Sequence, residues 1–389
     1  MDIIIACTGL GLSLLVARSQ SFQVEHFYSR LALLFAVAGL GTAVGSLFLS
    51  RLSDRFGRKP MLLISIAGIM VSSLLLGVSL KWWHLFAVMP FRSCFMGIYW
   101  PSLEARITDG AAGREMTRRL GLFGISFCLG LLVGHPLCGL LSDQWLRAPL
   151  YAAAGLCLVL LAFLWITFRS DGAYDGHRPA SRQETGPGAA AGGSRGLARA
   201  FVLSAWIANA LSYAVAAVLR GIFPRFATLP LEQGGLAFNG FETGAIVAGA
   251  NVGMLFIFLV FGKYHFWHYR FRYLVLAQAL ALLGCLGFST CSDAGVLFAG
   301  SLLFGFASGI IYISSIYYSL EGEGGRAGQS GLHEGVLCFG YAGGMIATAV
   351  ATRFLESHRT PYWVCVVAIA VGIAVQAVIW ARARTRVAG

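Results

Sequence analysis

Long apolar runs separated by short polar segments make up most of the chain. A helix needs about 20 apolar residues to cross a bilayer, and twelve runs approach that length. The predicted membrane-spanning helices are 2–17, 31–52, 61–80, 83–107, 119–142, 148–168, 200–222, 240–262, 272–290, 295–319, 330–353 and 361–381. The first run has no basic segment before it and no clear cleavage site, so we interpret it as a span rather than a signal peptide. Whether Met1 is the true start stays open.

One polar interruption is much longer than the others. Residues 169–199 are rich in Gly, Ala, Pro, Ser and Arg, and a segment of this composition cannot build a hydrophobic core. We therefore expect a flexible linker between an N-terminal six-helix bundle (1–168) and a C-terminal six-helix bundle (200–389). The predicted fold is an all-α integral membrane protein with twelve transmembrane helices in two pseudo-symmetric bundles.

Composition agrees with a membrane protein. Hydrophobic residues make up 57% of the chain and charged residues 12%, whereas a soluble domain carries about 25% charge. The net charge is +12, but the basic residues lie in short gaps between apolar runs, so no nucleic-acid partner is expected. The nine cysteines lie mostly within apolar runs and lack metal-ligand spacing. We interpret them as small buried hydrophobic residues and expect neither a metal site nor a cofactor.

The distribution of Lys and Arg predicts the orientation. If the linker is cytoplasmic, 20 of the 29 basic residues lie on its side of the membrane, 7 lie opposite, and Arg92 and Arg220 lie within spans. An excess of Lys and Arg marks the cytoplasmic side. The sequence therefore predicts a multi-pass protein of the cell membrane with both termini in the cytoplasm.

Glycine pairs recur at every third predicted span. Gly-x-x-x-Gly removes side chains along one helix face and allows two backbones to approach. The pairs in the second, fifth, eighth and eleventh spans are Gly41/Gly45, Gly130/Gly134, Gly249/Gly253 and Gly340/Gly344. This recurrence predicts a repeated unit of three helices, which is typical of secondary transporters.

The fourth, seventh and tenth spans carry polar residues at helical spacing, unlike the third, sixth, ninth and twelfth. Polar groups that face lipid are costly, so these stripes predict an enclosed polar cavity; hydrogen bonding between helices without a cavity is the alternative. The candidate substrate-binding residues are Arg92, Tyr99, Asn209, Tyr213, Tyr312 and Ser315.

Two further residues are candidates for proton coupling. His135 titrates near neutral pH, and Glu334 lies within the eleventh span, where a buried carboxyl group can take up a proton. The alternatives are structural: His135 satisfies the backbone freed by Pro136, and Glu334 caps a helix start. We expect Glu104 to form a surface ion pair and Arg220 to extend to the membrane interface.

The loop between the second and third spans has a distinctive sequence. It reads Ser-Arg-Leu-Ser-Asp-Arg-Phe-Gly-Arg-Lys over 50–59. This resembles the signature loop of the major facilitator superfamily, Gly-x-x-x-Asp-Arg-x-Gly-Arg-Arg/Lys, with Ser50 in place of the first Gly. The fifth span is similar to the glycine-proline motif of the antiporter branch, with His135 inserted before Pro136. The corresponding loop of the second half, 262–273, has no acidic residue.

The resemblance implies a mechanism as well as a fold. Members of this superfamily bind cargo between two halves that rock about it. The signature acid, here Asp54, is implied to lie near the start of the eleventh helix and to keep the cytoplasmic side shut. The residues of this conformational gate are then Asp54, Arg55, Gly57 and Arg58.

We therefore predict a secondary active transporter that moves a small organic molecule by alternating access, driven by protons and exporting its cargo as an antiporter. The alternatives are a proton-coupled importer of an organic anion or sugar-like solute, and a non-transporting sensor with the same fold. No nucleotide-binding loop, Ser/His/Asp order, metal cluster or pair of buried carboxylates indicates an enzyme. The expected partners are the lipid bilayer, the cargo and H+, and the protein is expected to be a monomer. Substrate, direction, coupling ion and stoichiometry stay open.

Overall fold

The computed structural model describes residues 1–108, 111, 113–167, 192–264, 266–320, 326–355 and 357–388. Within these ranges the regular structure is helical and no strand is present. The N-terminal part contains α1 (Asp2–Arg18), η1 (Gln20–Phe22), α2 (Phe27–Val44), the π-helical η2 (Gly45–Leu49), α3 (Leu52–Phe56), α4 (Arg58–Gly77), α5 (Trp82–Thr108), α6 (Gly113–Gln144) and α7 (Ala148–Thr167). The C-terminal part contains α8 (Gly192–Ala217), the π-helical η3 (Val218–Ile222), α9 (Phe223–Thr228), η4 (Leu231–Gln233), α10 (Gly240–Phe261), α11 (Phe271–Thr290), α12 (Ala294–Leu320), α13 (Arg326–Phe354) and α14 (Thr360–Ala388).

Each predicted span coincides with one helix, except that the second coincides with α2 and η2 and the seventh with α8 and η3. Ten of these helices are long and apolar enough to cross a membrane. The exceptions are α1, which has 17 residues, and α5, which carries Arg92, Glu104, Arg106 and two internal prolines. The polar residues of α5 have a place in the structure, because Arg92 and Glu104 are both buried within the protein.

The predicted linker, 169–199, lies outside the described residues as far as position 191. Its C-terminal boundary was placed too late, because α8 already begins at Gly192. Leu, Ala and Arg are good helix formers, and residues 197–200 read Leu-Ala-Arg-Ala. The helix therefore extends beyond the apolar run from which the boundary was predicted.

The glycine pairs lie where helices approach most closely. Gly41 of α2 and Gly45 of η2 face α5, and Gly249 and Gly253 of α10 face α12. A Cβ added at Gly45 or Gly253 would overlap the facing backbone, so a side chain at either position would force these helices apart.

The same arrangement recurs for the other two pairs. Gly130 and Gly134 of α6 face α1, and Gly340 and Gly344 of α13 face α8. The second span thus pairs with the fourth and the fifth with the first, just as the eighth pairs with the tenth and the eleventh with the seventh. Matching contacts in the two parts support the internal repeat predicted from the spacing of the glycines.

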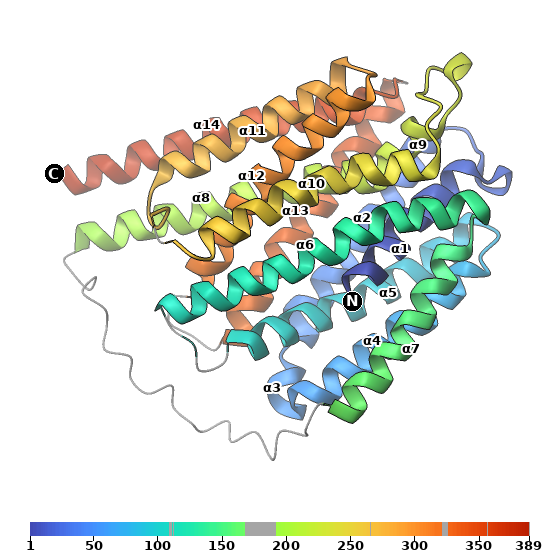
Figure 1. The fold of residues 1–389 in the computed structure, drawn as a ribbon. Helices are drawn as coiled ribbons and strands as arrows, with labels where there is room; N and C mark the ends of the chain where they lie inside the picture. Colours follow the sequence, from blue (N-terminus) through green and yellow to red (C-terminus); the bar gives the residue numbers. More distant parts are fainter. Residues whose placement is uncertain are drawn as a thin grey trace.

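Two helix pairs make the most extensive contacts between the N-terminal and C-terminal parts. Figure 1 shows α4, α5 and α7 on one side of the molecule and α11, α12 and α14 on the other, while α6 runs along α10 between them. The second pair is α2 with α13. These pairs touch near both ends, since α6 meets α10 at Gly121 as well as at Gly139. We call the end that carries α3 the predicted cytoplasmic end, and the other the opposite end.

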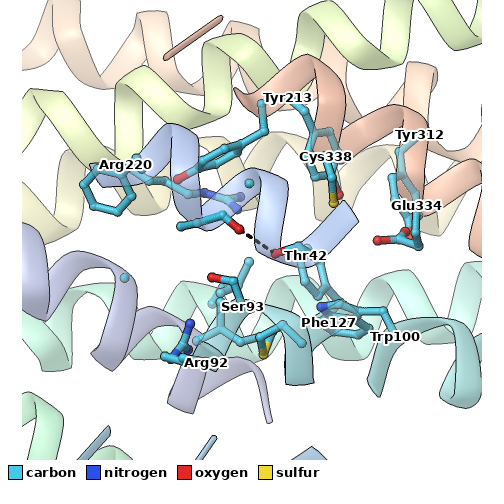
Figure 2. Close-up of a pocket in the computed structure, with 18 of the residues that line it drawn as sticks. Thr42, Arg92, Ser93, Trp100, Phe127, Tyr213, Arg220, Tyr312, Glu334 and Cys338 are labelled. Carbon is cyan, nitrogen blue, oxygen red and sulfur yellow. Dashed lines mark hydrogen bonds between the residues drawn. The ribbon is translucent and has the colours of Figure 1, made fainter. Parts of the chain in front are cut away.

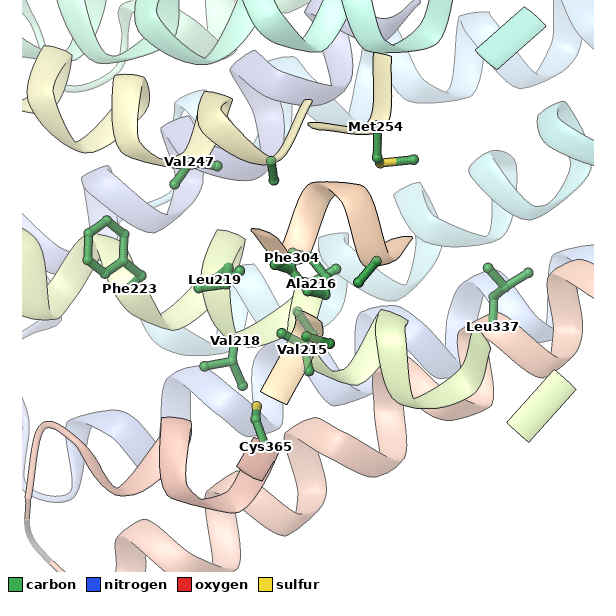
Figure 3. Close-up of a cluster of buried hydrophobic side chains, with 14 of the residues drawn as sticks. Val215, Ala216, Val218, Leu219, Phe223, Val247, Met254, Phe304, Leu337 and Cys365 are labelled. Atoms are coloured by element: carbon green, nitrogen blue, oxygen red, sulfur yellow. The ribbon is translucent and has the colours of Figure 1, made fainter. Parts of the chain in front are cut away.

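A hydrophobic cluster holds the C-terminal helices around α8 and η3. Figure 3 shows Val215 of α8, Val218 of η3 and Phe223 of the adjoining α9, with Val247 of α10 and Cys365 of α14 around them. All five side chains are buried. Dispersion contacts of this kind, rather than a hydrophobic driving force, favour helix association where the alternative surroundings are lipid.

The glycine packing can be tested with a matched pair on α13. Gly340→Ala places a methyl group on the backbone of Ala210, whereas the methyl group of Gly343→Ala meets no atom within 4 Å. Overpacking costs about 1–3 kcal/mol. We therefore expect Gly340→Ala, but not Gly343→Ala, to lower the thermal unfolding temperature of the purified protein in detergent. Equal unfolding temperatures for the two variants would show that this approach is not tight.

Candidate functional site

A cavity of about 200 Å³ lies between the N-terminal and C-terminal parts. Helices α1, α2, α5 and α6 line one side, and α8 with η3, α10, α12 and α13 line the other (Figure 2). The polar and charged residues of the lining are Thr42, Arg92, Ser93, Trp100, His135, Tyr213, Arg220, Tyr312, Glu334 and Tyr341. The position between two groups of helices is the one that alternating access requires of a cargo site.

The structure brings five of the predicted site residues to this cavity. These are the substrate-binding candidates Arg92, Tyr213 and Tyr312 and the proton-coupling candidates His135 and Glu334. The role of each residue in transport stays a prediction.

The other three substrate-binding candidates lie outside the cavity lining. Tyr99 lines a separate hollow beside α1 and α6. Asn209 is buried, and neither polar atom of its side chain has a hydrogen-bond partner. The Oγ of Ser315 lies 3.2 Å from Nδ1 of His333. Helical spacing alone did not separate the cavity face from neighbouring packed faces.

Arg92 is a buried cation on α5 with a donor to spare. Its side chain donates a hydrogen bond to Oγ1 of Thr8 on α1. The Nε–H is buried without a hydrogen-bond partner. Because a guanidinium group offers five donors and cannot be deprotonated in proteins, a buried arginine with an unused donor is suited to hold a polar ligand.

Arg220 also faces the cavity, so the prediction that it extends to the membrane interface is wrong. It lies on the π-helical turn η3, and a π-bulge changes the direction in which side chains leave a helix. Figure 2 shows it beside Tyr213. No residue in the described part of the chain forms a hydrogen bond or an ion pair with its guanidinium group.

Glu104 and Glu334 form a buried acidic pair that joins the two parts of the protein. Glu104 comes from α5 and Glu334 from α13, and they are 1% and 6% exposed. Their carboxyl groups lie within hydrogen-bonding reach of each other, and Tyr312 of α12 donates a hydrogen bond to Oε1 of Glu104 over 2.9 Å. Two carboxyl groups can share a hydrogen bond only if one of them is protonated, so this pair is placed to bind a proton.

This pair corrects three expectations. Glu104 is not part of a surface ion pair, since it is buried and bonded to Tyr312. Glu334 lies eight residues beyond the first residue of α13, Arg326, and lines the cavity, so it does not cap the helix start. The expectation that no two carboxyl groups pair in the interior is wrong as well.

His135 connects α6 with α10. Its ring is buried, and Nδ1 lies 3.2 Å from the amide Nδ2 of Asn251. The backbone of His135 also packs against Gly244 of α10. These contacts fit a structural role next to Pro136, while the position of His135 in the cavity lining keeps proton coupling open.

Asp143, near the end of α6, joins the two parts at the opposite end of the molecule. Its Oδ1 accepts a hydrogen bond from the backbone N–H of Gly240 over 2.9 Å, and its Oδ2 accepts one from Phe241 over 3.1 Å. These N–H groups belong to the first turn of α10, where the helix dipole favours a negative charge. Arg18 of α1 donates to Oδ1 of the same carboxylate at 2.6 Å.

Two further contacts between the parts lie at the same end. Arg225 of α9 donates to the carbonyl oxygen of Ala17 over 2.6 Å, and its guanidinium lies 4.5 Å from the ring centroid of Phe27. Nδ1 of His358 lies 2.9 Å from the hydroxyl oxygen of Tyr28. The three contacts together form what we call the opposite-end latch.

The predicted gate lies at the other end of the molecule. Arg55 is exposed. Gly57 has a φ of 92°, a backbone region that favours glycine. Arg58 is buried and donates to Oγ of Ser53 over 3.3 Å. The side chain of Asp54 lies outside the described part of the structure. Because Gly331 of α13 packs against Ser46, the signature loop follows a segment that touches the beginning of α13, and the role of Asp54 as a latch stays a prediction.

Comparison with known proteins identifies the family. The sequence profile of the Major Facilitator Superfamily matches residues 3–342. The chain belongs to the Major Facilitator Superfamily. This confirms the resemblance drawn from the signature loop and the prediction of an all-α membrane protein with that fold.

Curated members of the superfamily resemble parts of the chain. The class B tetracycline resistance protein of Escherichia coli is 29% identical over 145 residues, which is 37% of this chain and 36% of the relative. The multidrug resistance protein MdtG of Serratia proteamaculans is 32% identical over 137 residues, 34% of this chain and 33% of the relative. The class C tetracycline resistance protein of Escherichia coli is 32% identical over 162 residues, 40% of this chain and 41% of the relative. The alignments thus span about two fifths or less of each relative.

The opposite-end latch can be tested through Cys338, which lines the cavity. In a variant that keeps Cys338 as its single cysteine, Asp143→Asn removes the charge that binds both Arg18 and the start of α10. We expect a several-fold faster reaction of Cys338 with a membrane-impermeant maleimide added at the opposite end.

Glu242→Gln is the matched control for this experiment. Glu242 also caps the start of α10, through the capping box with Asn239, but both residues lie in the C-terminal part. It should leave the labelling rate unchanged. If Asp143→Asn labels no faster than Glu242→Gln, the contact between Asp143 and α10 does not hold this end closed.

Proposed function

We propose that this member of the Major Facilitator Superfamily is a secondary active transporter that exports a small organic molecule in exchange for protons. The observation that carries the proposal is the buried acidic pair of Glu104 and Glu334. It lies at a polar cavity and joins the N-terminal part to the C-terminal part. A titratable link in this position couples proton binding to the separation of the two parts.

The direction of coupling follows from electrostatics. With one proton the two carboxyl groups attract each other through a hydrogen bond. Without it, two negative charges face each other in a medium of low dielectric constant, where their repulsion is much stronger than in water. Loss of the proton therefore favours separation of α5 from α13 near the predicted cytoplasmic end, where an exporter releases its proton and takes up its cargo.

Export is favoured over import by two observations. The fifth span resembles the antiporter motif, and the relatives named above are called tetracycline or multidrug resistance proteins. A proton-coupled importer of an organic anion or sugar-like solute is the alternative. We further propose a monomer in the cell membrane, with both termini in the cytoplasm and no enzymatic activity.

Everted membrane vesicles provide the test. A respiratory substrate acidifies the vesicle interior, and tetracycline, ethidium and a fluorescent quinolone are then added one at a time while internal pH is followed with acridine orange. An exporter that exchanges cargo for protons should release protons when one of these compounds is added. Glu334→Gln should reduce this release at least tenfold, because glutamine cannot give up the shared proton.

Glu242→Gln serves as a control, since Glu242 is exposed and lies outside the cavity. Uptake of the added compound into vesicles whose pH gradient has been abolished with nigericin would contradict proton coupling. Proton release that is as large in Glu334→Gln as in the unmodified protein would contradict the role of the acidic pair.

A further inference from the structure

We propose that the cargo carries an acidic oxygen group attached to an aromatic body, and that Arg92 and Arg220 bind this group together, one from each part of the protein. The inference rests on the proposed function, since it names the class of molecule that the central cavity transports. A polar cavity alone does not define its cargo, whereas this inference assigns the sign of the cargo's charge and the residues that select it.

The two arginines of the cavity are not paired with its carboxyl groups. Arg92 uses Thr8 as a partner and has a buried Nε–H without one. Arg220 has no hydrogen-bond or ion-pair partner among the described residues. The acidic groups are instead bound to each other and to Tyr312. The structure thus keeps two cations available although two carboxyl groups line or adjoin the same space.

A simple charge balance shows what the cavity lacks. Arg92 and Arg220 contribute two positive charges, and Glu104 with Glu334 contributes one negative charge when the pair holds its proton. Unpaired charge in a poorly hydrated interior is costly. A ligand with one negative charge would balance these groups, and an arginine can bind a carboxylate through two parallel hydrogen bonds.

The two ends of the cavity differ in charge and in aromatic content, and this difference sets the orientation of such a ligand. Figure 2 shows Arg220 on one side of the cavity and Glu334 on the other, with Trp100 and Phe127 nearer to Glu334 than to Arg220. Phe123 and Phe258 also line the cavity. An aromatic body would pack against these rings, while its acidic group would point to the arginines and away from the acidic pair.

Because the arginines belong to different parts of the protein, the ligand would bridge them. Arg92 lies on α5 and Arg220 on η3. Arginine stays charged throughout the proton cycle, so recognition of the anion does not depend on the acidic pair. The proton would then control the contact between the parts, whereas the arginines would control which molecule is accepted.

Matched aromatic acids and amides test the inference directly. The probes are benzoate with benzamide, 2-naphthoate with 2-naphthamide, and anthracene-2-carboxylate with its amide, measured by calorimetry on the purified full-length protein. We expect at least one acid to bind the unmodified protein about tenfold or more tightly than its amide, as charge-assisted hydrogen bonds require. Arg92→Gln and Arg220→Gln should each remove this preference by weakening the acid and not the amide.

Controls separate this inference from the proposed function. Arg30→Gln, at an exposed position of α2, tests for a general effect of surface charge and should keep the preference. Glu334→Gln should reduce proton release in vesicles at least tenfold and still prefer the acid. If no acid binds more tightly than its amide, or if the preference survives in both arginine variants, the inference is overturned even where proton exchange is intact. A preserved preference without any transport would instead contradict the proposed function alone.

Discussion

The structure depends on one constraint, which is that charged side chains inside a membrane protein must be enclosed by protein. Arg92, Glu104 and Glu334 are buried, and Arg220 faces the same cavity. None of these groups could face lipid without a large cost. Contact between the N-terminal and C-terminal parts encloses them, through α6 with α10 and α2 with α13. The glycines that allow these helices to approach, such as Gly121 and Gly139 of α6, therefore contribute to this enclosure.

The contacts between the two parts differ in chemical character along the molecule. At the opposite end, Asp143 accepts hydrogen bonds from the first turn of α10 and forms an ion pair with Arg18. Around the cavity, the link between Glu104 and Glu334 exists only while it holds a proton. An interface with an ion pair at one end and a titratable contact nearer the other can respond to protons at one end first. Such asymmetry is what directional exchange of cargo and protons needs.

Most of the fold could be predicted from the sequence, because the membrane imposes a minimum length on each apolar run and the glycine pairs mark close helix contacts. The site was predicted only in part. Arg92, Tyr213, Tyr312 and Glu334 could be assigned to the interior from their cost in lipid. The partnership of Glu104 with Glu334 could not, since 230 positions separate them in the chain and only packing of α5 against α13 brings them together.

Two other features depend on local geometry that a pattern of residues does not contain. Arg220 faces the cavity because it lies on a π-helical turn, and the residue types in this segment do not predict such a turn. Asp143 caps a helix of the other part of the protein, whereas a capping residue is normally sought in the same stretch of sequence. Asn239, which occupies that local position, caps the same helix from within. Because Asn239 already caps α10, the sequence does not indicate that Asp143 caps the same helix.

Distances between spin labels at the two ends of the molecule test alternating access most directly. Exposed positions are available in both parts: Phe56 and Tyr264 at the predicted cytoplasmic end, and Trp145 and Leu231 at the opposite end. Each pair would be labelled in a variant without other cysteines, and measured by pulsed electron paramagnetic resonance in lipid at pH 5 and pH 8. Alternating access around a titratable pair predicts that the Phe56–Tyr264 distance lengthens at pH 8 while the Trp145–Leu231 distance stays short, and that Glu334→Gln removes this change. Distances that are the same at both pH values, or that lengthen together at both ends, would contradict it.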